Sequence, residues 1–252
     1  MIEKAERDGN LKPGGTITSR NTGIGLAMVA TAKGYHIIIV MPETMSVECR
    51  KLMKGYGAEL ILTPGSEGMK GSIAKAEELV KEKSYYMPMQ FDNPENPNIH
   101  ELTTGPEIIS AMNGIGKSVD AFVAGVGTGG TLSGIGRALK KENPNTKVYA
   151  LEPSESPLLK DGKTGKHGIA AGFIPKNLDK DVYDGIVEVS TDEAMKIACE
   201  VAKNEGFLPG IFAGANIHGA IELAKKLGKG HAAVTVSPDG GDRYLSTALF
   251  NE

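Results

Sequence analysis

Short apolar runs alternate along this chain with longer segments of helical periodicity, and this alternation constrains the fold more than any other feature. The strand-like runs lie at residues 14–18, 36–40, 59–64, 119–126, 147–153, 185–190 and 232–238. Continuous apolar strands that are separated by helices are typical of a parallel sheet covered on both faces. The pattern therefore predicts an α/β protein of the doubly wound type.

Local end signals support the predicted helices. The charged opening "MIEKAERDGN" has the pattern of an amphipathic helix, and further helices are expected at residues 22–33, 46–55 and 69–83. Ser190 and Glu193 have the spacing of a capping box, and Gly206 can end the helix that they begin. One apolar face of that helix is formed by Ala194, Ile197, Ala198 and Val201.

A cluster of polar and proline residues, "FDNPENPNIH" at 91–100, interrupts the alternation. Two prolines among polar residues in so short a stretch indicate turns and a break between two parts of the chain. We expect a smaller N-terminal lobe at residues 1–95 and a larger C-terminal lobe at 96–252.

Composition excludes several classes of protein. The net charge of −3 argues against a general binder of nucleic acid or of anionic membranes. No apolar run approaches the length of a membrane span, and the charged start is not a signal peptide. The two cysteines, Cys49 and Cys199, imply no disulfide framework, and the histidines show no metal-ligand spacing. We expect a cytoplasmic protein without a metal site.

The stretch "AGVGTGGTLSGIG" at 124–136 follows a strand-like run and opens a helix, as a phosphate-binding loop does. Gly125, Gly127 and Gly130 satisfy the dinucleotide pattern, and Glu152 lies where a ribose-binding acid is expected. Thr128 and Thr131 favour a phosphate monoester, because its three oxygens gain from hydroxyl donors. A tight strand–helix turn without a ligand is the remaining interpretation. Leu132, Ile135 and Leu139 would form the buried stripe of the helix.

Five motifs together resemble the cysteine synthase (O-acetylserine sulfhydrylase) family. They are "SRNTGIGLAMVA" at 19–30, "MQFDNPENP" at 89–97, "GTGGT" at 127–131, "AGFIPKNLD" at 171–179 and "GDRYLSTALF" at 241–250. The resemblance covers essentially the whole chain, in order and at nearly family spacing. It implies a fold type II pyridoxal-phosphate enzyme with two open, mostly parallel sheets and helices on both faces.

The resemblance implies which residues hold the cofactor and substrate. Gly127, Thr128, Gly129, Gly130 and Thr131 would bind the phosphate of pyridoxal 5'-phosphate, and Asn21 would hydrogen-bond its ring oxygen. Thr18, Ser19, Thr22 and Gly23 would receive the substrate carboxylate at a helix N-terminus, with the help of Gln90. The family reaction is β-replacement, in which O-acetylserine loses acetate and sulfide takes its place to give L-cysteine.

The sequence departs from the family pattern at several site positions. The family's Schiff-base lysine lies in an "SVKDR"-like stretch upstream of the helix that begins here as "MIEKAERDG", so we expect no catalytic lysine among these residues and impaired activity. Arg20 replaces a glycine in the substrate loop. Gly240 replaces the serine that contacts the pyridine nitrogen, and Phe212 and Ala213 replace two small hydroxyl residues. The segment 165–175 is shorter than in the family.

Three functions remain open at this point. The first is cysteine synthesis, by a protein that the family resemblance also predicts to be a homodimer. The second is a non-catalytic paralogue that binds pyridoxal phosphate or the C-terminal tail of serine acetyltransferase. The third is a nicotinamide-dependent oxidoreductase, which would use Gly125, Gly127, Gly130 and Glu152 but would leave the other four motifs unexplained.

Overall fold

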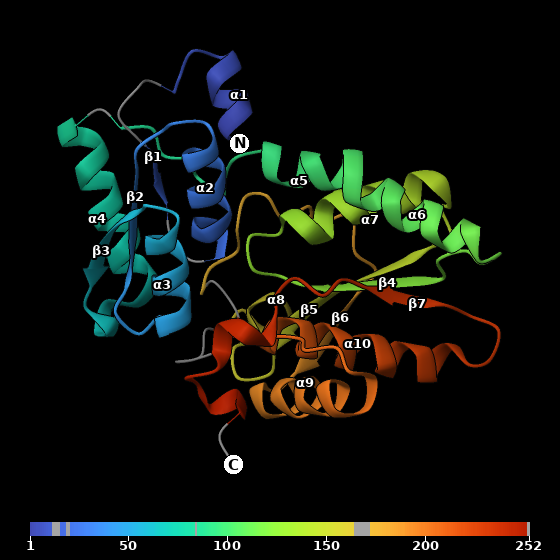
Figure 1. Ribbon diagram of the computed structural model, residues 1–252. Coiled ribbons are helices and arrows are strands. Elements are labelled where there is room, and N and C mark those ends of the chain that lie inside the picture. Colours follow the sequence, from blue (N-terminus) through green and yellow to red (C-terminus); the bar gives the residue numbers. More distant parts are fainter. Residues whose placement is uncertain (12–15, 19–20, 84, 164–171, 251–252) are drawn as a thin grey trace. The chain divides into compact units, whose positions relative to one another are not determined.

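The computed structural model describes residues 1–11, 16–18, 21–83, 85–163 and 172–250 (Figure 1). The chain forms two compact units. The N-terminal unit contains Met1–Asn93 together with Leu245–Thr247, and the C-terminal unit contains Pro94–Tyr244 together with Ala248–Glu252. Each unit has its own parallel sheet.

The sheet of the N-terminal unit has the strand order β1-β2-β3, with all neighbours parallel. Its strands are β1 Thr16–Thr18, β2 Ile37–Pro42 and β3 Glu59–Thr63. Its helices are α1 Ile2–Arg7, α2 Asn21–Ala32, α3 Val47–Gly55, the short η1 Gly65–Glu67 and α4 Gly68–Lys83. In register, Ile38 of β2 lies between Ile17 and Glu59.

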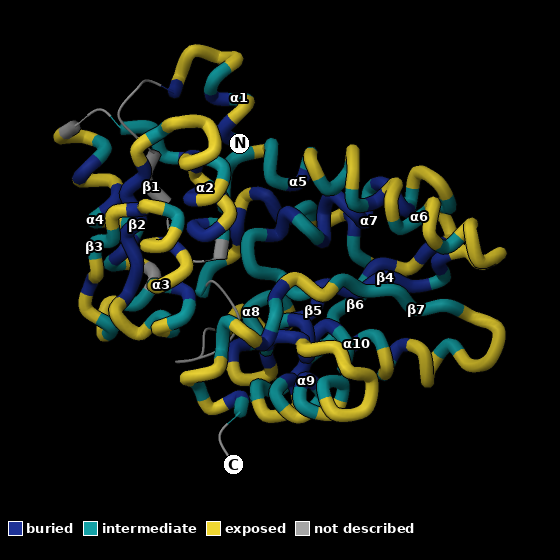
Figure 2. The backbone as a smooth tube through the Cα atoms, viewed as in Figure 1, coloured by how far each residue is buried: buried dark blue, intermediate teal, exposed yellow. Residues whose placement is uncertain are grey.

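The central strand β2 is buried on both faces, as Figure 2 shows in dark blue. Ile37, Ile39 and Met41 pack into one apolar core with residues of α1, α2 and α3. Ile38 and Val40 pack into a second core with residues of α4. Successive side chains of a strand point to opposite faces, so the continuous apolar run at 37–41 is what a strand covered by helices on both sides requires.

The C-terminal unit has a four-stranded parallel sheet in the order β6-β5-β4-β7. The strands are β4 Ala121–Gly125, β5 Lys147–Pro153, β6 Gly185–Val189 and β7 Ala233–Thr235. The longer helices are α6 Gly105–Gly114, α7 Gly130–Glu142, α9 Thr191–Glu205 and α10 Ile211–Leu227. The shorter helical segments are α5 Glu95–Ile99, the π-helical η2 His100–Thr104, α8 Leu158–Asp161, η3 Gly241–Tyr244 and η4 Ala248–Phe250.

Helices cover both faces of this sheet as well (Figure 1). Phe122 and Ala124 of β4 pack against α7, whose buried stripe is Leu132, Ile135 and Leu139. Ala121 and Val123, on the other face of β4, join a core with residues of α9 and α10. The predicted α/β class, the parallel sheets, their helical cover and the apolar stripe of α7 are confirmed.

The predicted capping box is present. The Ser190 hydroxyl accepts the Glu193 backbone N–H at 3.2 Å, and the Glu193 carboxylate accepts the Ser190 N–H at 2.9 Å. Gly206 ends α9 in the left-handed conformation, with φ 67°. Both cysteines are free thiols. No helix in the described ranges is long and apolar enough to cross a membrane.

One prediction of local structure is wrong. The stretch 91–100 was expected to be a series of turns, but only its first residues turn, and α5 begins at Glu95. Pro94 is the N-cap residue, and Pro97 lies in the first turn of α5, where its missing N–H has no helical partner to lose. The helical segment then continues through η2 into α6.

Candidate active site

The loop between β4 and α7 combines two different uses of glycine. Gly129 adopts the left-handed conformation with φ 79°, and a Cβ there would lie 2.8 Å from the backbone N and Cα of Leu178. A Cβ on Gly130 would collide with the side-chain amide of Asn96. A Cβ on Gly127 would meet no protein atom within 4 Å. Gly129 and Gly130 therefore serve the packing of the protein, whereas Gly127 leaves space open for a ligand.

Two threonine hydroxyls flank this glycine pair, as the sequence suggested. The Thr128 hydroxyl accepts the Asn96 Nδ2–H at 2.8 Å and the Gly130 backbone N–H at 3.3 Å. The Thr131 hydroxyl lies 3.3 Å from His100 Nε2. Burial lowers the pKa of His100 below its ordinary value, which favours the neutral ring. The loop thus has hydroxyl groups held in place by side chains from α5 and η2.

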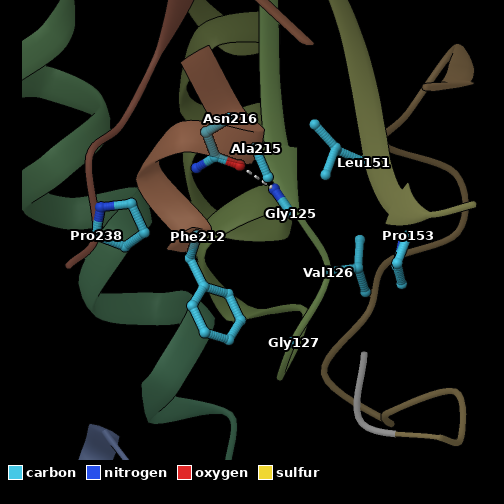
Figure 3. A pocket seen from close by; sticks show the side chains of 9 residues that line it. All are labelled: Gly125, Val126, Gly127, Leu151, Pro153, Phe212, Ala215, Asn216 and Pro238. Carbon is cyan, nitrogen blue, oxygen red and sulfur yellow. Dashed lines mark hydrogen bonds between the residues drawn. The ribbon is translucent and has the colours of Figure 1, made fainter. Parts of the chain in front are cut away.

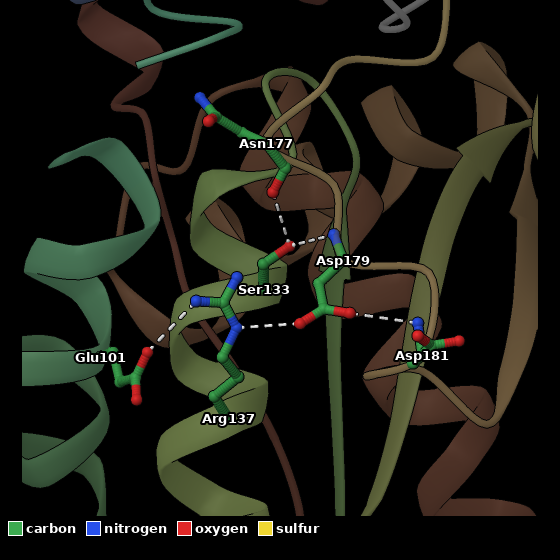
Figure 4. Close-up of polar contacts among 6 residues, drawn as sticks. All are labelled: Glu101, Ser133, Arg137, Asn177, Asp179 and Asp181. Carbon is green, nitrogen blue, oxygen red and sulfur yellow. Dashed lines mark hydrogen bonds and ion pairs between the residues drawn. The ribbon is translucent and has the colours of Figure 1, made fainter. Parts of the chain in front are cut away.

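The loop is also fixed from the segment that follows Gly172. The Ser133 hydroxyl of α7 donates to the Asn177 carbonyl at 3.0 Å and accepts the Asp179 N–H at 2.9 Å. Arg137, one turn further along α7, donates from Nε to the Asp179 carboxylate at 2.9 Å (Figure 4). These bonds hold Leu178 against Gly129, so the tight contact of the loop is supported by a polar network.

A pocket in the C-terminal unit opens beside this loop (Figure 3). It is lined by Gly125, Val126, Gly127, Leu151, Pro153, Phe212, Ala215, Asn216 and Pro238. The buried Asn216 connects two walls, because its Oδ1 accepts the Gly125 N–H at 2.8 Å and its Nδ2 donates to the Val236 carbonyl at 2.9 Å. A largely apolar pocket beside a glycine-rich loop with fixed hydroxyls has the composition of a small-molecule site.

Two helices begin near the pocket, and their N-termini differ. The Asp239 carboxylate accepts the backbone N–H of Phe212 at 3.2 Å and of Ala213 at 2.7 Å, and so closes the start of α10. The Tyr244 hydroxyl donates to the same carboxylate at 2.6 Å. Burial raises the pKa of Asp239, although these hydrogen bonds oppose the shift. The N-cap residue of α7 is Gly129, which has no side chain, so no carboxylate of its own neutralises the positive end of α7.

Gly240 lies two residues after the pocket-lining Pro238. It forms a bridge with Pro209, and a Cβ at this position would collide with the Asp242 carboxylate. The sequence predicted that Gly240 offers no side chain to a ring nitrogen, and the structure shows a backbone position held by its neighbours. Among the other departures, Phe212 lines the pocket and Ala213 is buried.

The residues predicted to bind the substrate carboxylate lie in the N-terminal unit. The helix α2 begins at Asn21, so Thr22 and Gly23 lie in its first turn, where backbone N–H groups lack helical partners. A Cβ on Gly23 would lie 3.1 Å from the Met53 sulfur, which explains the glycine by packing. Ser19 and Arg20, and the side chains of Thr18 and Asn21, lie outside the described residues.

Gln90 lies in a turn that begins at Met89, a residue with positive φ of 53°. Asp92 and Asn93 both donate their backbone N–H groups to the Met89 carbonyl at 2.8 Å, and Asn93 Nδ2 donates to the Pro88 carbonyl. A positive φ in a residue other than glycine is uncommon and costs backbone energy. The turn is therefore specified by its own hydrogen bonds, and Gln90 is half-buried within it.

The acid of the dinucleotide pattern has another role. Glu152 is only 2% exposed, and its carboxylate accepts the backbone N–H groups of Leu159 at 2.6 Å and Lys160 at 3.0 Å. A carboxylate that is buried and bonded to its own chain does not present its oxygens to a ribose. The spacing of Gly125, Gly127, Gly130 and Glu152 thus arises without a dinucleotide.

Asn96, His100, Asn216 and Asp239 were not singled out from the sequence. The spacing of Asn96 and His100, four residues apart, places them on one helical face and was a usable signal. Asn216 and Asp239 had none, because each acts on backbone groups far away in the sequence.

Comparison with known proteins assigns the class. The family model described as pyridoxal-phosphate dependent enzyme matches residues 1–239, and the chain belongs to this family. The cysteine synthase of Staphylococcus aureus (strain N315) is 58% identical over 257 residues, which cover 100% of this chain and 82% of that protein. The resemblance to cysteine synthases that the five motifs indicated is confirmed.

Solved structures agree with this assignment. An O-ureido-L-serine synthase superposes with a TM-score of 0.93 at 42% identity, covering 99% of this chain and 80% of its own. An O-acetyl serine sulfhydrylase isoform from Entamoeba histolytica superposes with a TM-score of 0.90 at 43% identity, covering 99% of this chain and 76% of its own. The fold is that of the fold type II enzymes, and the cofactor is pyridoxal phosphate.

The residues of the C-terminal unit fit this cofactor. The open space at Gly127, the two hydroxyls beside it and the N-terminus of α7, which no carboxylate caps, have the chemistry that a phosphate monoester needs. When bound, pyridoxal phosphate supplies an electron sink for negative charge at the substrate α-carbon. The protein would supply orientation and hydrogen bonds.

Proposed function

We propose that this protein serves the β-replacement reaction that forms L-cysteine from O-acetylserine and sulfide. The observation that carries the proposal is the loop Gly127–Thr131, with ligand space at Gly127 and fixed hydroxyls at Thr128 and Thr131, in a chain of the cysteine synthase family. The relatives' names supply the substrates, and the loop supplies the physical fit to the cofactor.

In this proposal each unit has its own task. Gly127, Thr128, Gly129, Gly130 and Thr131 bind the cofactor phosphate, and Gly240 lies on the ring side without offering a side chain. In the N-terminal unit, Asn21 hydrogen-bonds the ring oxygen. The substrate carboxylate binds at the start of α2 through Thr18, Ser19, Thr22 and Gly23, with Gln90 as a further donor.

None of the nine described residues that line the pocket of the C-terminal unit is a lysine, and on this ground we keep a second candidate. The scaffold would then bind pyridoxal phosphate, or the C-terminal tail of serine acetyltransferase, without catalysis. A tail carboxylate needs the backbone donors at the start of α2 and no lysine. We assign no catalytic residue to this chain under either candidate.

We also propose a cellular location, an oligomeric state and lobe boundaries for this protein. We place it in the cytoplasm, as a homodimer, with lobes at residues 1–95 and 96–252. The free thiols at Cys49 and Cys199 fit the reducing cytoplasm. Gel filtration with light scattering tests the dimer.

One experiment separates the two candidates. The purified protein is incubated with pyridoxal phosphate, desalted, and its visible spectrum recorded, followed by borohydride reduction and mass spectrometry. Cysteine formation from O-acetylserine and sulfide is measured on the same sample. Turnover together with one labelled lysine supports cysteine synthesis. Retention without label or turnover, with tail-peptide binding in calorimetry, supports the second candidate. If the protein retains no pyridoxal phosphate after desalting, both cysteine synthesis and non-catalytic binding of this cofactor are contradicted.

A further inference from the structure

Two side chains from α5 and η2 each contact one threonine of the loop Gly127–Thr131. Asn96 of α5 donates to the Thr128 hydroxyl at 2.8 Å, and His100 of η2 lies 3.3 Å from the Thr131 hydroxyl. Asn96 and His100 are four residues apart and lie on one face of their helical segment. Thr128 and Thr131 flank the pair Gly129–Gly130. One side chain thus meets each hydroxyl of the loop.

The close approach of α5 and η2 to α7 is built into α7. A Cβ on Gly130 would collide with Asn96, and a Cβ on Gly134 would collide with the Pro97 carbonyl and lie 2.7 Å from the His100 Cβ. Gly130 and Gly134 are four residues apart, so they form one smooth strip on the surface of α7. This strip lets Asn96 and His100 reach hydroxyls that a bulkier surface would hold at a distance.

The hydrogen-bond capacity of Thr128 then fixes the direction of its hydroxyl. A threonine hydroxyl has one hydrogen to donate and two lone pairs that accept. Asn96 Nδ2–H and Gly130 N–H both donate to Thr128 Oγ1, which fills its accepting capacity. The hydroxyl hydrogen has to be donated elsewhere. A phosphate oxygen at Gly127 is an acceptor of the right chemistry.

His100 has a related effect on Thr131. Its second nitrogen, Nδ1, lies 3.0 Å from the Thr104 hydroxyl within the π-helical segment, so both ring nitrogens have partners. π-helical turns occur frequently at functional sites. The ring is held at both nitrogens and in turn holds the Thr131 side chain.

We propose that Asn96 and His100 are positioning residues for a phosphate monoester: Asn96 makes Thr128 a hydroxyl donor toward the ligand, and His100 holds Thr131 beside it. The inference rests on the proposed function, because the ligand phosphate is that of pyridoxal phosphate. Neither residue needs to touch the ligand. Each acts through its threonine.

A double-mutant cycle on pyridoxal phosphate binding tests the proposal. The dissociation constant is measured by equilibrium dialysis for the native protein, Thr128→Val, Asn96→Leu and the double variant. Thr128→Val removes a hydrogen bond to a charged group and should raise the dissociation constant roughly tenfold to a hundredfold. Asn96→Leu should raise it roughly fivefold to thirtyfold. The double variant should bind within about twofold of Thr128→Val, since Asn96 acts only through that hydroxyl.

Further variants separate the effect of hydrogen-bond direction from the effect of side-chain size. Asn96→Asp has the same shape but only accepts hydrogen bonds, so it would withdraw the Thr128 hydrogen from the ligand and should bind more weakly than Asn96→Leu. Asn98→Leu, two residues along α5 and on another side of the helix, is the matched control and should leave binding unchanged. His100→Gln should bind more tightly than His100→Leu, because glutamine retains a polar group for Thr131.

The outcomes are distinguishable. If Thr128→Val leaves the dissociation constant unchanged, the loop does not bind the phosphate and the proposed function loses its main support. If Thr128→Val weakens binding but Asn96→Leu does not, the function stands and the positioning role of Asn96 is refuted. Independent, additive losses in the double variant also refute it. Thermal unfolding of each apo variant, followed by circular dichroism, shows whether a weak binder is folded.

Discussion

The helices α7 and α10 both begin near the same pocket, but a carboxylate caps the N-terminus of α10 and none caps that of α7. The start of α10 is closed by Asp239, whose carboxylate accepts from Phe212 and Ala213. The start of α7 has glycine as its cap and no carboxylate of its own. A helix N-terminus becomes an anion site only if the protein does not neutralise it first. Of these two helix starts, the one that no carboxylate caps is that of α7, and we propose it for the phosphate.

The largest expected loss of stability comes from removing the carboxylate that caps the N-terminus of α10. Asp239→Ala removes a buried acceptor and leaves the N–H groups of Phe212 and Ala213 and the Tyr244 hydroxyl without that partner. Loss of a helix cap together with a buried hydroxyl contact should lower the free energy of unfolding by about 3–4 kcal/mol. Urea denaturation followed by far-UV circular dichroism measures it. Asp239→Asn keeps one oxygen and should lose less. A loss under about 1 kcal/mol for the alanine variant would contradict the capping role.

The second test concerns the shape of the cap of α7. Gly129→Ala forces alanine into the left-handed region, at about 1–2 kcal/mol, and adds the contact with the Leu178 backbone at 2.8 Å. We expect a total loss of about 2–3 kcal/mol in the free energy of unfolding. Gly162→Ala is the matched control, because Gly162 has a similar φ of 68° and no atom within 4 Å of its added Cβ. Equal losses in both variants would show that the Leu178 contact costs nothing.

The third test addresses the ligand side of the same loop. Gly127→Ala adds a methyl group where no protein atom lies within 4 Å, so the apo protein should change by less than about 1 kcal/mol in unfolding free energy. The methyl group would enter the space assigned to the phosphate, and the dissociation constant for pyridoxal phosphate should rise about tenfold. Equilibrium dialysis and urea denaturation give the two numbers. Unchanged affinity would place the phosphate elsewhere.

The smallest effect is the pH dependence of stability. Burial raises the pKa of Asp239 above its ordinary 3.8, so its titration contributes stability that is complete below about pH 4 and is lost as pH rises through the raised pKa. Asp120 behaves in the opposite sense, because the Ala232 N–H and His231 lower its pKa. Its contribution is present above about pH 4 and is lost as pH falls through the lowered pKa.

The opposite pH dependences of the Asp239 and Asp120 contributions to stability are measured by comparison with amide variants. The unfolding free energy of the native protein relative to Asp239→Asn should fall as pH rises from 4, and that relative to Asp120→Asn should rise from pH 3 to 5. Urea denaturation across pH 3 to 7 gives both curves. Parallel curves for the two variants would show that Asp239 is not desolvated.

The sequence predicted the sheets because their signal is local. The run at 37–41 is apolar at every position, and Ser190, Glu193 and Gly206 define a helix by their own chemistry. The glycine-rich loop between β4 and α7 was also predictable, since Gly127–Thr131 are contiguous. Asn96 and Thr128 are 32 residues apart, and no pattern in the chain links them. Glu152 shows the converse: its spacing suggested a ribose site, but spacing does not tell whether a carboxylate is buried against backbone N–H groups.

The N-terminal unit is not a continuous piece of chain. Leu245–Thr247 belongs to it, and the Ser246 hydroxyl donates to the Glu48 carboxylate of α3 at 2.8 Å. A gene fragment cut after Asn93 would lack this contribution, which comes from far along the chain. For protein engineering, the chain therefore passes between the two units at three points, after Asn93, Tyr244 and Thr247, instead of at one. Exchange of the N-terminal unit between relatives would have to carry the codons for 1–93 and 245–247 together.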